Sequence, residues 1–140
     1  MDFKLELVLL QVSDVDRAKT FYAEKAGFNL DVDTTVGDQM RVVQLTPPGS
    51  ACSIGFGIGI TDAAKGSAQG LHLVISDILA ARAELTGRGV DVSEVRHLES
   101  GTWVPGPHPQ RNSYESFADF SDPDGNIWVL QEVRRDGSAA

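Results

Sequence analysis

Two similar stretches, Val12-Ser13-Asp14-Val15 and Ile75-Ser76-Asp77-Ile78, decide the fold of this chain, and their aspartates lie 77 − 14 = 63 residues apart. In each stretch a Ser-Asp pair, which can accept hydrogen bonds from free N–H groups, comes before apolar residues at helical spacing. The pattern therefore predicts the start of a helix in both places. Each predicted helix ends at a glycine, Gly27 or Gly89, which tolerates a left-handed C-cap. The repeat indicates two copies of one structural module.

Strand-like segments surround both predicted helices in the same order. One short apolar strand precedes each helix, and three strand-like segments follow it. The predicted strands are 5–12, 28–32, 39–45 and 51–60 in the first copy, and 71–75, 90–96, 116–120 and 127–133 in the second. This order, repeated once, predicts an α+β fold. The expected domain covers 4–133, with module one at 4–60, module two at 70–133 and a flexible tail at 134–140.

Length and composition are those of an ordinary globular protein. The chain has 140 residues, 41% of them hydrophobic and 23% charged. No apolar run reaches the roughly 18 residues of a membrane helix. The net charge of −8 repels nucleic acid and anionic membranes. The single cysteine, Cys52, forms no internal disulfide, and residues 1–6 lack the pattern of a secretory signal. We therefore expect a cytoplasmic protein that binds neither nucleic acid nor membrane.

The motifs resemble those of the vicinal oxygen chelate superfamily, which includes glyoxalase I, extradiol dioxygenases, fosfomycin-inactivating enzymes and bleomycin-resistance proteins. The resemblance rests on Val-Ser-Asp-Val-Asp-Arg-Ala-Lys-Thr-Phe-Tyr at 12–22, Gly27-Phe28, and Phe-Ser-Asp-Pro-Asp-Gly-Asn at 120–126. It implies two tandem βαβββ modules that form a cup-shaped curved sheet with helices outside. It also implies that modules pair within one chain or between two chains, so a homodimer is expected. The fold does not set the chemistry, because it hosts both metal enzymes and metal-free binders.

In metal-dependent members of that superfamily, each module supplies two inward-facing ligands. One lies seven residues before the capping aspartate, and the other lies four residues after the hairpin glycine. In this chain those positions hold Leu7, Ser53, Gly70 and Val129. Leucine, glycine and valine offer no ligand atom and serine is a poor ligand, so we expect no metal and no other cofactor.

The alternation of side chains along the strands predicts which residues face the inside of the cup. Leu7, Leu9 and Ser53 fall inward, and Gly55 and Gly57 leave space beside them. The bulky apolar residues between them would pack under a helix. A register shifted by two residues also brings His72 and Gln131 inward. No catalytic residue is assigned with this pattern, although His72 could serve as an acid, a base or a hydrogen-bond donor.

Residues 97–113 are rich in proline and glycine and predict a long irregular loop that closes as a lid. Trp103 in this loop could stack on a ligand or pack at a subunit interface, and Tyr114 could contribute a hydroxyl group. His97 and His108 are expected to be solvated. The complete set of expected ligand-binding residues is Leu7, Leu9, Ser53, His72, Trp103, Tyr114 and Gln131.

The leading hypothesis is a metal-free binding protein that sequesters a small hydrophobic or cationic molecule, similar in kind to the bleomycin-resistance branch. The alternative is a lyase, isomerase or dioxygenase of the same superfamily that uses a divalent metal ion held by His72 and Gln131 or by a partner chain. A third reading is a metal-free acid/base enzyme that depends on His72 alone.

Overall fold

The computed structural model describes residues 1–134, so the tail predicted at 134–140 lies outside the described residues except for Arg134. The chain divides into two compact units. Unit 1 contains Met1–Ala68 and Asp122–Asn126, and unit 2 contains Gln69–Ser121 and the segment from Ile127 onward. Within residues 1–134, no helix has the length and apolar character needed to cross a membrane.

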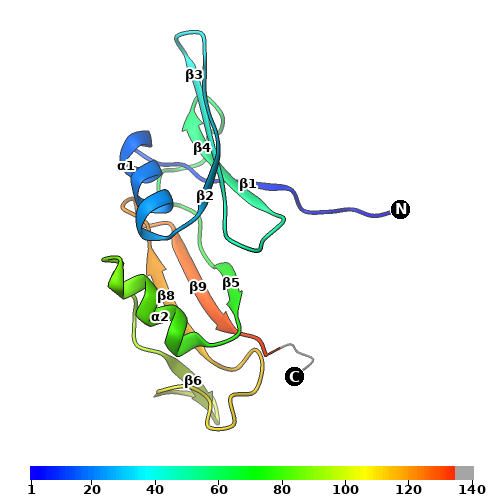
Figure 1. Cartoon of the computed structure of the whole chain (residues 1–140), viewed down its shortest axis with the longest axis vertical. Coiled ribbons are helices and arrows are strands. Elements are labelled where there is room, and N and C mark those ends of the chain that lie inside the picture. The colour runs from blue at the N-terminus through cyan, green and yellow to red at the C-terminus, as the bar shows by residue number, and fades with distance from the viewer. Residues whose placement is uncertain (135–140) are drawn as a thin grey trace. The chain divides into compact units, whose positions relative to one another are not determined.

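Unit 1 holds a four-stranded sheet with the strand order β1-β4-β3-β2 (Figure 1). Its strands are β1 Leu7–Leu9, β2 Asn29–Val36, β3 Met40–Thr46 and β4 Ser53–Ile58. Strand β1 pairs in parallel with β4, and the other neighbours are antiparallel. Between β1 and β2 the chain forms helix α1 (Val15–Thr20), which continues into a π-helical turn, η1 (Phe21–Lys25).

Unit 2 holds a five-stranded sheet with the order β5-β9-β8-β6-β7. Its elements are β5 Leu71–Ile75, α2 Ile78–Gly87, β6 Arg96–Glu99, β7 Thr102–Pro105, β8 Phe117–Ser121 and β9 Ile127–Glu132. Strand β5 pairs in parallel with β9, as β1 does with β4. The predicted α+β class is confirmed, and both units have the expected order of strand, helix and further strands.

The repeated stretches begin the two helices as predicted, with aspartate rather than serine as the cap. The side chain of Asp14 accepts a hydrogen bond from the N–H of Arg17, and that of Asp77 accepts two from the first turn of α2. The helical segments end before Gly27 and Gly89, whose φ angles are 81° and 90°. Glycine adopts this left-handed conformation without a Cβ penalty, so local sequence signals alone specify both helix ends.

The buried core of each unit lies on the helix-facing side of its sheet. Its strand residues are Val43, Leu45, Ile54 and Phe56 in unit 1, and Ala118, Phe120, Trp128 and Leu130 in unit 2. These positions alternate along their strands, as the pleat of a half-buried sheet requires. The intervening residues therefore point to the face opposite the helix, which is the face predicted to bind a ligand.

The motif residues Asp122-Pro-Asp-Gly form a turn between β8 and β9 that is anchored within unit 1. The N–H of Gly125 donates to the carbonyl of Asp122 at 3.0 Å, which closes the turn. The Asp122 carboxylate accepts hydrogen bonds from the hydroxyl of Tyr22 at 2.7 Å and from the side-chain amide of Asn126 at 2.8 Å. All of these polar groups except the glycine are buried, so the turn depends on this network.

The strand predicted at 90–96 is wrong over most of its length, because β6 begins only at Arg96. The carbonyl oxygens of Val92 and Ser93 accept hydrogen bonds from the guanidinium group of Arg82 at 3.1 and 2.7 Å. A side chain of α2 thus donates to backbone carbonyl groups that would otherwise accept hydrogen bonds from a neighbouring strand. The apolar pattern that suggested a strand reflects the burial of Val90, Val92 and Val95.

The prediction of an irregular loop over 97–113 is also wrong in its first part. Strands β6 and β7 form an antiparallel hairpin whose turn residues, Ser100 and Gly101, have φ angles of 50° and 80°. Two successive positive φ angles match the twist of paired strands in a tight hairpin. Trp103 therefore lies on a strand and not on an irregular lid, and only the following segment lacks regular structure.

Gly57→Ala should destabilise unit 1 by about 3 kcal/mol or more, because its Cβ would lie 1.8 Å from the carbonyl oxygen of Arg41 on β3. Urea unfolding followed by circular dichroism measures the change. Gly55→Ala is the matched control, since its Cβ would meet only side-chain atoms, the nearest 3.2 Å away on Leu9. The control should cost less than about 1.5 kcal/mol. Equal losses in both variants would contradict the observed register.

Candidate ligand-binding faces

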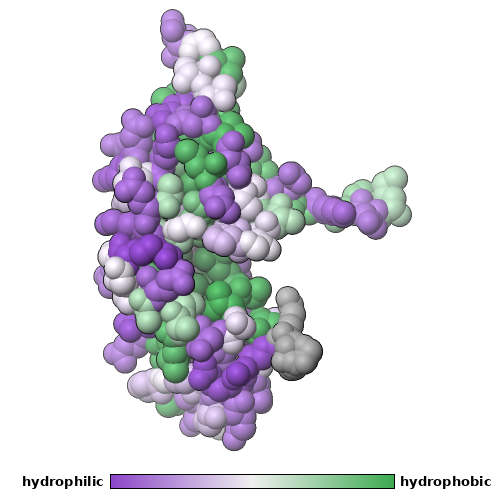
Figure 2. Space-filling model, viewed as in Figure 1, coloured by the Kyte–Doolittle hydropathy of each residue, from purple (hydrophilic) through white to green (hydrophobic). Residues whose placement is uncertain are grey.

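Leu7, Leu9 and Ser53 lie together on the face of unit 1 opposite α1. The sheet register pairs Leu7 with Ser53 and Leu9 with Gly55. Because Gly55 has no side chain, the Cδ atoms of Leu7 and Leu9 lie 3.3 and 3.2 Å from the point that a Cβ would occupy there. Leu9 remains 42% exposed. Figure 2 shows apolar areas between polar ones on the face in view. The two leucines thus form an apolar surface open to solvent.

A polar cluster that the sequence did not reveal adjoins this apolar surface. The hydroxyl of Thr46 donates to the carboxylate of Asp31, and it lies 2.7 Å from the hydroxyl of Ser53. The register of β2 against β3 shifts between Leu30 and Val32, which places Asp31 at an irregularity. A strict alternation cannot predict the side of a residue at such a bulge. The face therefore offers a carboxylate beside an apolar surface.

His72 lies exposed on the face of unit 2 opposite α2. Its Nδ1 donates a hydrogen bond to the carbonyl oxygen of Gly70 at 2.6 Å. Because a carbonyl oxygen only accepts, Nδ1 carries the proton, and Nε2 of the neutral ring is an acceptor. The carbonyl oxygen of Gly70 thus orients the ring.

The register corrects the position that sequence spacing assigned to Gly70. Val129 pairs with His72, as Ser53 pairs with Leu7 in unit 1, so His72 is the counterpart of Leu7. His72 precedes its capping aspartate by five residues and Leu7 precedes its own by seven. The chain between the first strand and the helix is therefore shorter in unit 2, and a fixed spacing misplaces the position by two residues.

The residues at these positions do not fit a divalent metal ion. The two opposed pairs are Leu7 with Ser53 and His72 with Val129. Only the imidazole is a strong ligand, whereas metal sites of nitrogen and oxygen donors need at least three. Over residues 1–134, no three His, Cys, Asp or Glu side chains are grouped so that they could hold a metal ion. We therefore derive no step through a metal.

Trp103 lies in a cluster of aromatic and charged side chains on the hairpin side of unit 2. The guanidinium carbon of Arg96 lies 5.0 Å from the centre of the indole ring, and the ring of Phe117 packs edge-on at 5.6 Å. Arg96 also donates to the carboxylate of Asp119 at 3.0 Å. Trp103 nevertheless remains 49% exposed. A groove of about 370 Å³ beside it is lined by Ser93, Glu94, Val95, Arg96, Trp103, Val104 and Pro105. The cluster presents an aromatic surface that needs no lid movement.

The structure brings Tyr114 and Gln131 together. The side-chain amide of Gln131 donates to the carbonyl oxygen of Tyr114 at 3.2 Å. The N–H of Tyr114 donates in turn to the carbonyl of Glu132 at 2.7 Å. Tyr114 thus lies beside β9 rather than on a strand of its own, with an exposed side chain.

His97 and His108 are not solvated, which corrects the expectation from sequence. His97 is only 3% exposed, and the ring of His108 packs edge-on against it at 6.1 Å. Nδ1 of His97 lies 2.7 Å from the carbonyl oxygen of Gly106, and Nε2 lies 2.8 Å from the carboxylate of Glu99. Both partners only accept, so both bonds require the cationic ring. The hydrogen bond to Glu99 and the bond to Gly106 raise the pKa of His97 above its ordinary value.

The free energy of unfolding should therefore depend on pH through His97. A raised pKa in the folded state means that the protonated ring stabilises the fold below the ordinary value of 6.5, and that this contribution is lost as pH rises through the raised pKa. His97→Gln should remove this dependence. Urea unfolding at stepped pH, with the imidazole C2–H followed by NMR, measures it. A difference between the two proteins that stays constant from pH 5 to pH 9 would contradict the assignment.

Comparison with known proteins places these faces in a family context. A protein-family model described as Glyoxalase/Bleomycin resistance protein/Dioxygenase superfamily matches residues 4–130. The structure of TnmS3, an antibiotic binding protein from Streptomyces sp. CB03234, superposes with a TM-score of 0.72 and 32% identity over 94% of this chain and 97% of that chain. A glyoxalase/bleomycin resistance protein from the same strain gives a TM-score of 0.69 and 34% identity over 91% and 99% of the two chains. The protein YetH of Bacillus subtilis (strain 168) is 27% identical over 89% of this chain and 94% of its own length.

Proposed function

Since this chain belongs to the Glyoxalase/Bleomycin resistance protein/Dioxygenase superfamily, we propose that it binds and sequesters a small hydrophobic or cationic molecule without a metal ion. The observation that carries the proposal is which residues occupy the paired strand positions. Leu7 and Val129 stand where metal-dependent members carry ligands. The antibiotic binding described for the similar protein TnmS3 supports the same class of function.

The side chains of each face suit such a ligand. Leu7 and Leu9 would remove apolar ligand surface from water, which favours binding by about 25 cal/mol for each Å² buried. Asp31 beside them would attract a cation or accept a hydrogen bond. In unit 2, the indole of Trp103 offers a flat surface for stacking, and Nε2 of His72 would accept a hydrogen bond from a ligand donor.

Isothermal titration tests the proposed ligand class directly. The panel contains cationic glycopeptides, planar aromatic cations and neutral planar aromatics, with matched anionic compounds for comparison. Binding heats are expected for the hydrophobic and cationic compounds. Heats that appear only with the anionic compounds would overturn the proposal.

Trp103→Ala should weaken binding of a planar aromatic by about 1–3 kcal/mol, because a stacked aromatic anchor is lost. Trp103→Phe is the matched control and should retain most of the affinity. His72→Ala should also weaken binding of a ligand that donates a hydrogen bond, because the acceptor Nε2 is lost. If Trp103→Ala leaves the affinity intact but dissociates a dimer, Trp103 is an interface residue and not a ligand contact.

We propose further that the protein acts in the cytoplasm as a homodimer. Among residues 1–134, the outer edges of four strands have no neighbour within their sheet. These strands are β1 and β2 in unit 1 and β5 and β7 in unit 2. Such edges are normally covered, and a second copy is the simplest cover. Light scattering at micromolar concentration should give twice the chain mass of 15.0 kDa. A mass equal to that of one chain would refute the dimer.

His72 is the one observation that favours the alternative, a metal-dependent lyase, isomerase or dioxygenase of the same superfamily. It occupies the counterpart of Leu7, and its Nε2 is an acceptor in the neutral ring. Metal analysis of protein purified without chelator decides between the two functions. One equivalent of Ni, Zn, Fe or Mn per chain, lost in His72→Ala, would establish the alternative and remove the metal-free proposal.

A further inference from the structure

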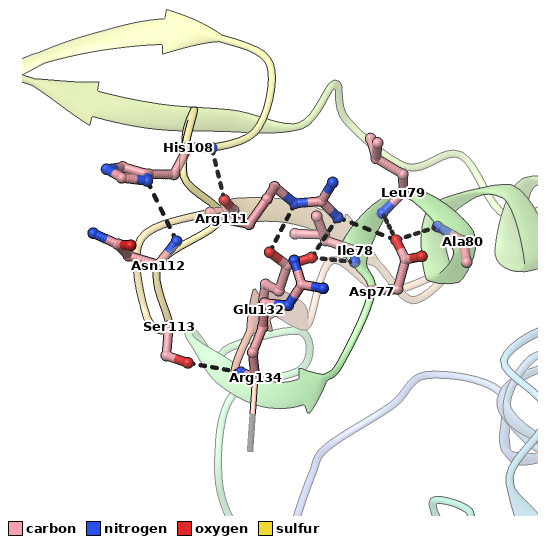
Figure 3. A network of polar contacts seen from close by, with 11 residues as sticks. Asp77, Ile78, Leu79, Ala80, His108, Arg111, Asn112, Ser113, Glu132 and Arg134 are labelled. Carbon is pink, nitrogen blue, oxygen red and sulfur yellow. Dashed lines mark hydrogen bonds and ion pairs between the residues drawn. The ribbon is translucent and has the colours of Figure 1, made fainter. Parts of the chain in front are cut away.

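The helix-facing side of unit 2 contains a fully buried carboxylate, that of Glu132 on β9. It accepts a hydrogen bond from the N–H of Ile78 in the first turn of α2 at 2.9 Å. Arg111 donates to it twice, from Nε at 2.9 Å and from Nη2 at 2.6 Å (Figure 3). Nη2 of Arg111 also lies 3.2 Å from the carboxylate of Asp77, the cap of α2. One arginine therefore joins an irregular segment to a strand and a helix.

Removing one partner of this pair would leave an uncompensated buried charge, so the pair holds its geometry strongly. Burial by itself disfavours the ionised carboxylate of Glu132. The hydrogen bonds from Arg111 and Ile78 and the charge of Arg111 outweigh burial and hold the pKa of Glu132 below its ordinary value. Glu132 is therefore ionised at neutral pH and keeps Arg111 in place.

The backbone around Arg111 adopts a conformation that needs such a restraint. Arg111 and Tyr114 have φ angles of 55° and 71°, in the left-handed region that favours glycine. The N–H of Arg111 donates to the carbonyl of His108 at 2.8 Å, and the hydroxyl of Ser113 accepts from the N–H of Arg134 at 2.7 Å (Figure 3). Unlike these two hydrogen bonds, the pair between Arg111 and Glu132 is charged and reaches the buried side of the sheet.

Neighbouring residues of β9 connect the two faces of the sheet. Gln131 and Glu132 are adjacent in a strand, so their side chains point to opposite faces. On the helix side Glu132 holds Arg111, and on the other side the amide of Gln131 holds the carbonyl of Tyr114 at 3.2 Å. The N–H of Tyr114 bonds the carbonyl of Glu132 itself. A change at Arg111 that moves Glu132 would thus affect Tyr114 through two hydrogen bonds, one to the carbonyl of Glu132 and one from the amide of Gln131.

We propose that Arg111 is a positioning residue that acts through Glu132 and fixes the backbone at Tyr114, so that Tyr114 and the Gln131 amide are presented together to a ligand. The inference rests on the proposed binding function and adds to it a residue on the opposite side of the sheet. Arg111 need not touch the ligand. It preorganises these two groups, because ordering them only on binding would cost conformational entropy and weaken the affinity.

The test compares four variants with the natural chain. Arg111→Gln removes the charge, and Arg111→Lys keeps the charge but loses the two-pronged bond. The double variant Arg111→Met with Glu132→Leu replaces the buried carboxylate and its half-buried partner by apolar groups, a change that often preserves the fold. Arg88→Gln is the matched control, since Arg88 pairs with Glu84 on the surface of α2.

The first measurement needs no ligand. The side-chain amide signals of Gln131 and the backbone amide signal of Tyr114 are followed by NMR, with the melting temperature measured in parallel. Both signals should shift in the double variant, even if its melting temperature equals that of the natural chain. In Arg111→Lys both signals should shift less. Arg88→Gln should leave both signals unchanged. If the double variant folds with unchanged signals, or if only the melting temperature moves in every Arg111 variant, Arg111 is merely structural and the inference is wrong.

The second measurement uses ethidium as a planar cationic probe. Its affinity should fall about tenfold in the double variant and in Arg111→Gln, and it should stay unchanged in Arg88→Gln. Unchanged affinity in the folded double variant would overturn the role of Arg111 in binding. If the natural chain binds neither ethidium nor any compound of the titration panel, the proposed function fails, while the NMR comparison still decides whether Arg111 positions Tyr114 and Gln131.

Discussion

Successive side chains of a β-strand point to opposite faces, and in both units a helix covers one of those faces. The strand positions facing the helices, such as Phe56 in unit 1 and Trp128 in unit 2, are therefore committed to the core. The intervening residues are not committed to the core, so their side chains are available for binding. The leucines beside Gly55 and the imidazole opposite Val129 both belong to this set.

The features that were predictable from the sequence are those that neighbouring residues specify. Asp14 and Asp77 cap helices with their own side chains, and Gly27 and Gly89 end the helical segments through their own φ angles. The alternation along each strand is equally local, which is why the core face could be predicted. The family resemblance, which rests on the motifs at 12–22 and 120–126, is confirmed as well.

The features that sequence reasoning missed depend on partners far along the chain. The half-buried Arg111 pairs with the buried Glu132 across 21 residues, and the sequence around neither residue predicts the pair. His97 is buried because Gly106 and Glu99 accept from both of its nitrogens, which requires the β6–β7 hairpin to exist first. The register that makes His72 the counterpart of Leu7 likewise comes from strand pairing and not from a fixed spacing.

The sheets of the two units have corresponding strand orders, apart from the additional strand β7 in unit 2, but the residues at their paired first-strand and last-strand positions differ. Leu7 corresponds to His72, and Ser53 corresponds to Val129, so neither opposed pair repeats the other's chemistry. A metal ion requires several donors converging at bonding distance, and a single imidazole cannot supply them. A binding surface has no such requirement, because apolar area, stacking and isolated hydrogen bonds contribute separately. Each face therefore offers contacts suited to a small organic ligand, the leucines in unit 1 and the imidazole in unit 2.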